Sequence, residues 1–169
     1  MINLIEGKAW IFGDNIDTDQ IYPGRYLELT EPDKIAAHAM EGVDPNFSKD
    51  FKAGGILVAG DNFGCGSSRE HAVITLKESG VSAVIANSFA RIFYRNAINL
   101  GFPALICKDA RLKIKKGDRV TIDLSAGTVT DVESGEAFQG EKLSDHVMKI
   151  IENGGVIPMI KARISSTRS

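Results

Sequence analysis

The middle of the chain alternates short apolar runs with segments of helical periodicity, and this order limits the possible folds strongly. Residues 56–59, 81–86 and 103–107 are apolar runs typical of strands buried on both faces. Residues 69–79 and 89–100 lie between them, have helical spacing and end at glycines. Parallel strands need a connection of about a dozen residues, which a helix supplies. The order therefore predicts a parallel βαβαβ centre with right-handed crossovers.

The flanking segments alternate polar and apolar side chains instead. Residues 119–124 and 128–132 predict the antiparallel strands of a hairpin around Ala126-Gly127. Three further elements are expected, a strand at 8–12 and helices at 31–40 and 143–153. Residues beyond about 161 are polar and are expected to form a loose tail. Residues 1–169 are thus predicted to form a single α/β domain, with antiparallel strands beside the parallel centre.

Composition narrows the class of protein. The 169 residues include 20 Lys and Arg against 22 Asp and Glu and contain no basic run, so we expect no nucleic-acid partner. No signal-peptide pattern and no apolar stretch of about 18 residues is present, so no membrane partner is expected. The two cysteines, Cys65 and Cys107, are too few for a disulfide framework and favour a reduced, cytoplasmic protein.

The stretch with the most chemical information runs from Gly60 to His71. It follows an apolar strand and precedes a predicted helix, so its backbone N–H groups and the helix dipole favour an anion. Ser67 and Ser68 add hydroxyl groups, and Arg69 adds a guanidinium that can bind a carboxylate through two hydrogen bonds. Ligands of open α/β sheets bind beyond the carboxyl ends of the strands, where this stretch lies. The sequence therefore predicts a pocket for a small carboxylate or phosphate.

Other interpretations of these residues fit less well. The glycine spacing matches neither a P-loop nor a dinucleotide-binding fingerprint. His71 lies four residues after Ser67, so both are expected on one helical face, but no nucleophile-elbow motif surrounds them. The three aspartates of residues 14–19 lack the spacing of a calcium loop, so no metal site is predicted. Each residue taken alone also fits an ordinary helix cap or loop.

Three ordered motifs resemble one family of enzymes. They are residues 13–19, 62–72 and 88–99. Together they resemble the small subunits of the aconitase-superfamily hydro-lyases, especially those of 3-isopropylmalate dehydratase and of its relative homoaconitase. The resemblance covers about residues 6–160 and implies the swivelling β/β/α domain of that superfamily, in agreement with the predicted order of strands and helices.

The resemblance also implies a partner and a cofactor. Family members work with a large subunit that holds a [4Fe-4S] cluster on three cysteines, and the cluster iron acts as a Lewis acid on a small hydroxy-dicarboxylate substrate. With two cysteines, this chain is expected to bind none of that cluster. The implied activity is a dehydratase of leucine biosynthesis that isomerises 2-isopropylmalate and 3-isopropylmalate, in a heterodimer or heterotetramer with the large subunit.

Residue by residue, the resemblance implies roles at the site. Ser67 matches the base that removes the proton alpha to a carboxylate, and Ser68 and Arg69 match contacts to the substrate carboxylate. Supporting roles are expected for Thr18, Asp19 and His71. A serine hydroxyl is a poor base in water, so the helix N-terminus, the loop N–H groups and Arg69 would have to stabilise its alkoxide.

We expect the choice of substrate to be determined by Leu27, Glu28 and Leu29, which lie in a loop where family members differ. Homoaconitase-like members have an arginine there that binds an additional carboxylate, whereas isopropylmalate enzymes have apolar residues. Glu28 would repel a third carboxylate by on the order of 1 kcal/mol, and the leucines could contact an isopropyl group. Isopropylmalate is therefore favoured. A homoaconitase subunit, a dialkylmalate dehydratase subunit and a non-catalytic carboxylate-binding module stay open as alternatives.

Overall fold

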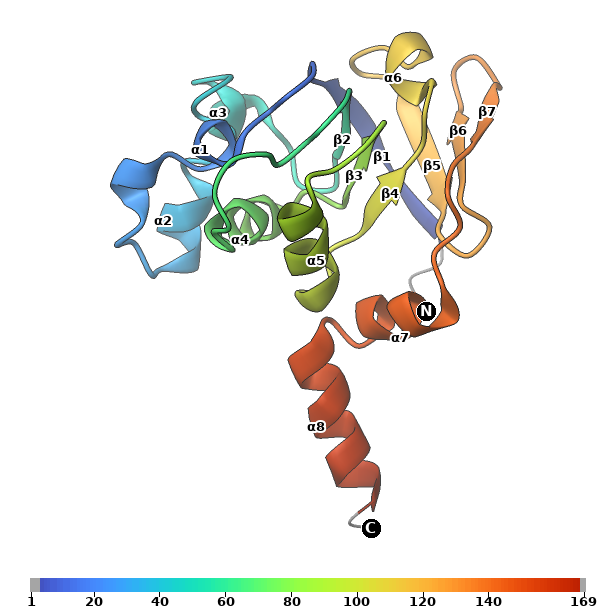
Figure 1. The fold of residues 1–169 in the computed structure, drawn as a ribbon. Helices are drawn as coiled ribbons and strands as arrows, with labels where there is room; N and C mark the ends of the chain where they lie inside the picture. The colour runs from blue at the N-terminus through green and yellow to red at the C-terminus, as the bar shows by residue number, and fades with distance from the viewer. Residues whose placement is uncertain (1–3, 168–169) are drawn as a thin grey trace.

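The computed structural model describes residues 4–167 and contains a seven-stranded mixed sheet with helices on both faces (Figure 1). The strands are β1 (Leu4–Ile11), β2 (Ile56–Ala59), β3 (Ala83–Ala86), β4 (Ala104–Ile106), β5 (Arg119–Asp123), β6 (Thr128–Asp131) and β7 (Ala137–Gln139). Their order across the sheet is β4-β3-β2-β1-β5-β6-β7. The first strand of the chain is therefore the central strand of the sheet, and the two halves of the sheet meet at it.

The two halves of the sheet differ in strand direction. The strands from β1 to β4 are parallel to their neighbours, with Trp10 paired with Leu57 and Ile85 with Leu105. On its other side β1 pairs antiparallel with β5, and β6 and β7 continue in the same antiparallel manner. This arrangement confirms the predicted parallel βαβαβ centre with antiparallel flanking strands. β7 was not predicted because its three residues are too short for a clear alternation.

Helices cover both faces of the sheet. They are α1 (Thr18–Ile21), α2 (Pro32–Ala36), α3 (Phe47–Asp50), α4 (His71–Glu78), α5 (Arg91–Asn99), α6 (Ala110–Lys113), α7 (Asp145–Glu152) and α8 (Val156–Thr167), with a 3-10 turn η1 (Gly24–Tyr26) before α2. α4 connects β2 to β3, and α5 connects β3 to β4. These two crossover helices pack on one face of the sheet, and α6 and α7 pack on the other.

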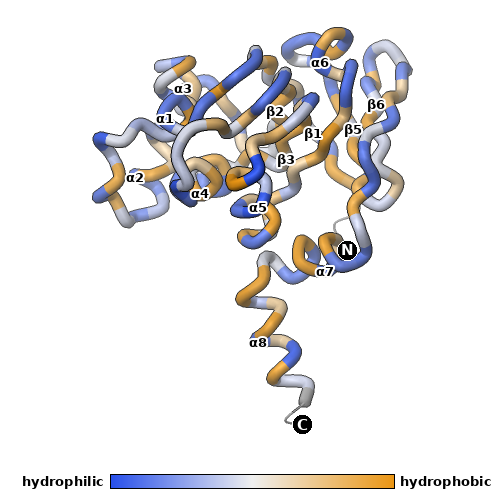
Figure 2. Tube along the Cα trace, in the orientation of Figure 1, coloured by the Kyte–Doolittle hydropathy of each residue, from blue (hydrophilic) through white to orange (hydrophobic). Residues whose placement is uncertain are grey.

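The parallel half is apolar on both faces. Every residue of β2 and β3 is buried, and these strands are among the hydrophobic segments at the centre of Figure 2. Leu57 belongs to the apolar cluster that includes Val73 of α4 and Phe93 of α5, whereas Ile56 belongs to the cluster that includes Ile151 of α7. Burying one such aliphatic side chain contributes roughly 1.5–3 kcal/mol. The strands are therefore held from both sides, and the loops at their ends start from rigid positions.

Two predicted helices begin later in the structure. α4 begins at His71, after residues 67–69 without regular structure, because the Ser67 N–H donates to Thr18 Oγ1 of α1. α5 begins at Arg91, two residues later than predicted, and Ser88, the serine directly before the predicted helix, does not cap it. The Ser88 Oγ accepts instead from the Asn62 N–H at 2.8 Å. In both cases a serine just before the predicted helix bonds a distant loop.

The predicted helix at 31–40 and the predicted loose tail also need correction. α2 ends at Ala36, because the chain then turns so that the Met40 N–H donates to Ile21 O at 2.7 Å. Residues 162–167, expected in a loose tail, belong to α8, which projects from the body of the molecule (Figure 1). Met, Lys, Ala and Arg residues in α8 favour this helix. Within residues 4–167, no helix combines the length and the apolarity needed to cross a membrane.

Candidate active site

Three loops meet at the carboxyl ends of β1, β2 and β3, at the sheet edge where the sequence predicts a carboxylate or phosphate pocket. The Gly64 N–H donates to Ile16 O at 2.7 Å, which joins the loop after β2 to the loop after β1. The Phe63 N–H donates to Ser88 O at 3.0 Å, which joins the loop after β2 to the loop after β3. Residues from three distant parts of the sequence therefore share one framework.

Gly64 permits the tight turn in the loop after β2. Its φ is +84°, in a region that side chains disfavour, and a Cβ at this position would lie 2.2 Å from Cγ of Phe93. After this turn the loop runs beside α1, where the Thr18 N–H donates to Cys65 O at 2.8 Å. The glycine thus allows Ser67 to approach the start of α1.

Ser67 and Thr18 form a hydroxyl pair. Their Oγ and Oγ1 atoms are 3.1 Å apart, and the Ser67 N–H donates to the same Thr18 oxygen at 3.1 Å. A hydroxyl group has one hydrogen and two lone pairs. Thr18 Oγ1 accepts from the Ser67 N–H, and its bond with Ser67 Oγ can run in either direction. Thr18 is buried, so this arrangement is protected from competing water.

A capping box sets the orientation of α1 and hence of Thr18. Asp17 is the N-cap residue, and its Oδ1 accepts from the Gln20 N–H at 2.7 Å. The Gln20 side chain accepts in return from the Asp17 N–H at 2.9 Å. Reciprocal bonds of this kind satisfy two backbone donors that the helix itself leaves unpaired. Asp17 of the first loop therefore organises the start of α1.

Ser68 and Arg69 follow on the same loop. Ser68 is exposed, and its carbonyl accepts from Asn96 Nδ2 of α5 at 3.2 Å. Arg69 Nη1 lies 4.0 Å from Asp19 Oδ1. This nitrogen is shielded from solvent and has no hydrogen-bond partner among residues 4–167. Buried polar atoms are rarely left unpaired, so the guanidinium has an unused donor suited to a carboxylate.

Asp19 connects α1 to η1 rather than contacting Ser67. Its Oδ1 accepts from the Gly24 N–H at 2.8 Å, on the same side as Arg69. Gly24 leaves room for the guanidinium, because a Cβ there would lie 3.0 Å from Arg69 Nη1. Of the predicted supporting residues, Thr18 is thus brought to the serine and Asp19 to the arginine.

His71 does not share a helical face with Ser67, because Ser67 precedes α4. Its ring stacks instead against Tyr22, with centroids 5.8 Å apart and planes 11° from parallel. The Tyr22 hydroxyl donates to Tyr26 O at 2.6 Å. Burial, and then the neighbouring Tyr26, raises the pKa of Tyr22, so this phenol stays a neutral donor. His71 therefore supports the segment around η1.

Leu27, Glu28 and Leu29 lie between η1 and α2. Glu28 is exposed, and both leucines are partly buried. The Leu27 N–H donates to Gly24 O at 3.2 Å, and the Leu29 N–H donates to Tyr26 O at 3.1 Å. No hydrogen bond or ion pair within residues 4–167 joins these three residues to the serines or the arginine of the glycine-rich loop. The link to that loop runs through η1 and Asp19.

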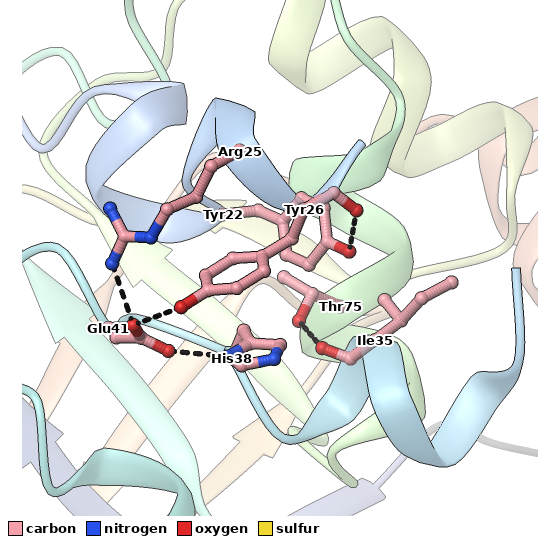
Figure 3. A network of polar contacts seen from close by, with 7 residues as sticks. All are labelled: Tyr22, Arg25, Tyr26, Ile35, His38, Glu41 and Thr75. Carbon is pink, nitrogen blue, oxygen red and sulfur yellow. Dashed lines mark hydrogen bonds and ion pairs between the residues drawn. The ribbon is translucent and has the colours of Figure 1, made fainter. Parts of the chain in front are cut away.

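A polar cluster beside this segment was missed by the sequence analysis (Figure 3). Glu41 Oε1 accepts from Tyr26 Oη at 2.8 Å and from Arg25 Nη2 at 2.9 Å, and Glu41 Oε2 lies 2.5 Å from His38 Nδ1. The Tyr26 and His38 rings stack with centroids 3.5 Å apart. Burial alone would raise the pKa of Glu41, but the hydrogen bonds from His38, Tyr26 and Arg25 and the His38 charge lower it overall. The only feature of the sequence that indicates this cluster is the spacing of three residues between His38 and Glu41.

Metal-ligating groups are dispersed in this chain. Within the described residues 4–167, no three His, Cys, Asp or Glu side chains lie close enough to hold a metal ion. Burial, followed by the charge of Asp109, raises the pKa of Cys107 to about 11, so its thiol is protonated at neutral pH. A protonated thiol is a poor metal ligand, and Cys65 is the remaining cysteine. These residues do not fit the ligand set of an iron–sulfur cluster.

Comparison with known proteins identifies a family model and close relatives. Residues 14–109 match the model described as the aconitase C-terminal domain. The chain is 48% identical, over 99% of its length and 100% of the relative's, to a protein of Methanocaldococcus jannaschii named isopropylmalate/citramalate isomerase small subunit. It is 52% identical, over 93% of its length and 96% of the relative's, to the 2,3-dimethylmalate dehydratase small subunit of Eubacterium barkeri.

A solved structure supports the same comparison. The crystal structure described as 3-isopropylmalate dehydratase from Methanocaldococcus jannaschii superposes with a TM-score of 0.92 at 46% identity. The match covers 98% of this chain and 99% of that chain. The similarity therefore includes the sheet and all three loops that build the site.

Proposed function

This chain belongs to the aconitase C-terminal domain family, and we propose that it is the small subunit of a 3-isopropylmalate dehydratase. Similarity over nearly the whole length of each small-subunit relative supports this assignment. In this role the chain works as half of a hydro-lyase of leucine biosynthesis. The enzyme interconverts 2-isopropylmalate and 3-isopropylmalate by removing and adding water.

The hydroxyl pair of Ser67 and Thr18 is the observation on which the proposed chemistry depends. Ser67 Oγ, as an alkoxide, accepts the proton alpha to a substrate carboxylate, and the electrons of the broken C–H bond form the double bond. The hydroxyl group leaves as hydroxide, for which the cluster of the large subunit would supply the Lewis acid. An alkoxide at Ser67 needs a donor beside it, and Thr18 Oγ1, 3.1 Å from Ser67 Oγ, can donate its hydrogen once that oxygen is deprotonated. Thr18 thus supports the base without touching the substrate.

The unpaired nitrogen of Arg69 supports a role in binding a substrate carboxylate. Its Nη1 is shielded from solvent and lacks a hydrogen-bond partner among the described residues 4–167, so a carboxylate would satisfy it. Asp19 lies 4.0 Å away and orients the guanidinium without bonding to it closely. The exposed Ser68 hydroxyl is the second contact that we assign to the carboxylate.

Selection of isopropylmalate is assigned to Leu27, Glu28 and Leu29. The leucines supply apolar surface for an isopropyl group, and the exposed Glu28 opposes a third carboxylate by on the order of 1 kcal/mol. A homoaconitase substrate, which has that third carboxylate, is therefore disfavoured. Citramalate and 2,3-dimethylmalate, which occur in the names of relatives, have smaller apolar groups and are the competing substrates to compare.

The proposal assigns the cofactor to another chain. The aconitase family uses a [4Fe-4S] cluster, and we place it on a separate large subunit, because the described residues of this chain do not fit its ligand set. The two chains would form a heterodimer or a heterotetramer, with the substrate between them. A cytoplasmic location stays a prediction.

The experiment that tests the function is reconstitution with an iron–sulfur large subunit. The complex is expected to convert isopropylmalate, and Ser67→Ala is expected to abolish turnover while assembly, measured by size-exclusion chromatography, is unchanged. Ser125→Ala is the matched control, because Ser125 is an exposed serine in the turn between β5 and β6. Turnover by the Ser67→Ala complex would remove Ser67 from the role of base.

A non-catalytic carboxylate-binding module is the second candidate, because the unpaired Arg69 nitrogen also fits it. Titrating the isolated chain with dicarboxylates and with phosphate separates the two functions. The module requires tight binding without a partner, whereas a subunit with half of a site is expected to bind weakly. Turnover by the isolated, iron-free chain would contradict the proposed division between subunits.

A further inference from the structure

The backbone on both sides of Glu41 is bonded to the end of α1. The Met40 N–H donates to Ile21 O at 2.7 Å, and the Gly42 N–H donates to Gln20 O at 3.0 Å. The approach is close, because a Cβ on Gly42 would lie 2.6 Å from Cα of Gln20. The position of Glu41 is therefore set relative to α1, the helix whose first residue bonds the proposed catalytic serine.

The segment from Leu27 to Leu29 has little support from its own backbone. Its two backbone hydrogen bonds run to carbonyl groups of η1, at Gly24 and Tyr26. Within residues 4–167, no backbone hydrogen bond joins residues 27–30 to any element beyond η1. Bonds within one turn cannot define where the turn lies relative to the sheet. The placement of the segment therefore depends on how η1 is held.

The backbone of η1 is bonded at Gly24 by Asp19 and at Tyr26 by the Tyr22 hydroxyl, and its side chains are held mainly by Glu41. The two donors from η1, Tyr26 Oη and Arg25 Nη2, bond the same carboxylate oxygen, and His38 bonds the other oxygen (Figure 3). Bonds to a charged acceptor are about twice as strong as neutral ones. The Tyr26 ring also rests on the His38 ring, and Arg25 lies 4.8 Å from the centroid of the Tyr26 ring. One carboxylate thus joins the turn before α2 to the turn after it.

We propose that Glu41 is a positioning residue for substrate selection, which holds η1 and thereby the Leu27–Leu29 segment in place relative to Ser67. This inference rests on the proposed function, because it assigns substrate contact to that segment. Glu41 itself touches no substrate. Without it, the segment occupies its binding-competent position in a smaller fraction of molecules, and KM rises by the inverse of that fraction. The Ser67–Thr18 pair is untouched, so kcat is preserved.

The test compares Glu41→Ala and Tyr26→Phe in the reconstituted complex. If the Leu27–Leu29 segment of the variant is in its binding-competent position in one molecule in ten, KM for isopropylmalate rises about tenfold. The kcat of the variant stays within about twofold of the wild-type value. The preference for isopropylmalate over citramalate is expected to fall in both variants. Tyr26→Phe removes one hydroxyl and retains the ring, so it keeps the test valid if Glu41→Ala folds poorly. The double variant is expected to be no worse than Glu41→Ala, because both changes break the same contact.

Hydrogen exchange supplies a readout independent of turnover. In the full-length chain, peptides covering residues 24–30 are expected to exchange at least about tenfold faster in both variants, while peptides of β2 and β3 are unchanged. Glu136→Ala is the matched control, because Glu136 bonds Lys113 through an exposed ion pair near β7. It is expected to leave KM and exchange at 24–30 unchanged.

Several outcomes would overturn the positioning role. Unchanged KM and unchanged exchange at residues 24–30 would do so, as would a fall in kcat equal to the rise in KM. Faster exchange throughout the chain would show that Glu41 contributes only general stability. A wild-type complex that does not convert isopropylmalate refutes the proposed function. In that case, faster exchange at residues 24–30 alone still supports Glu41 as the group that holds η1 in place, and unchanged exchange overturns that as well.

Discussion

Replacing Thr18 with valine removes one hydroxyl from the proposed active site and nearly preserves the volume of the side chain. The change deletes two hydrogen bonds, one from the Ser67 N–H and one between the Thr18 and Ser67 hydroxyl groups. At about 1 kcal/mol each, their loss lowers the free energy of unfolding by about 2 kcal/mol. A chain of this size loses about 2–4 °C of thermal midpoint per kcal/mol, so Thr18→Val is expected to melt about 4–8 °C lower.

The same change is expected to slow turnover more than it affects substrate binding. If the 2 kcal/mol is lost from the transition state, kcat falls about 30-fold at one factor of ten per 1.36 kcal/mol. Substrate contacts through Arg69 remain, so KM is expected to change little. The assay is steady-state turnover of isopropylmalate by the reconstituted complex, with thermal unfolding of the isolated small subunit in parallel.

Thr18→Ser is the matched control, because it keeps the hydroxyl and removes only one buried methyl group. Its expected cost is about 0.8 kcal/mol of stability with nearly normal kcat. The reasoning is refuted if Thr18→Val assembles normally and keeps kcat within twofold of the wild type. Equal losses of kcat in both variants would also refute it, since the hydroxyl group would then not be the cause.

Three further predictions concern groups around the site. Because the pKa of Glu41 lies below its ordinary value of 4.5, its ionic bonds stabilise the fold fully above pH 4.5 and are lost as the pH falls through the lowered value. The difference in thermal midpoint between the wild type and Glu41→Gln should therefore shrink over that range, and a constant difference would contradict this. A thiol-reactive dye at neutral pH should label Cys65 in the folded chain. Cys107 is buried and has a pKa of about 11, so it should react only after unfolding. Labelling of both cysteines in the folded chain would contradict this prediction. Gly64→Ala should lower the free energy of unfolding by about 3 kcal/mol or more, because the alanine would have both a left-handed φ and a steric overlap with Phe93. Gly13→Ala is the control, because a Cβ at Gly13 meets no neighbour within 4 Å. Equal losses for the two variants in denaturant titrations would contradict the prediction.

The parallel half of the fold could be predicted because its signal is local. Residues 56–59 are apolar at every position, and the structure has β2 at those residues. Helix starts were less predictable, because they depend on contacts between loops. Ser67 and Ser88 both look like helix caps in the sequence, but one bonds Thr18 and the other bonds Asn62. A pattern of neighbouring residues cannot indicate a hydrogen-bond partner that lies in a distant loop.

The candidate site could be predicted only in part for the same reason. The glycine-rich stretch suggested a carboxylate site by its composition, and the resemblance implied a supporting role for Thr18. The pairing of Thr18 with Ser67, 49 positions apart, is seen only in the structure. The pairing of Tyr26 with Glu41 was not expected at all. Its residues belong to a segment that the sequence predicted as a loop followed by one regular helix. The turn after α2 that turns Glu41 toward η1 has no clear local signal.

The central position of β1 has a consequence for the order in which the chain can fold. Leu4 pairs with Asp123 and Lys8 with Arg119, so β1 gains its second neighbour only after β5 has been synthesised. Until then β1 is an edge strand with a row of unpaired backbone groups, and such edges can recruit strands from other chains. Glu6 and Lys8 lie on this strand and are exposed even in the finished fold. Charges at these positions discourage intermolecular pairing during the interval before β5 arrives.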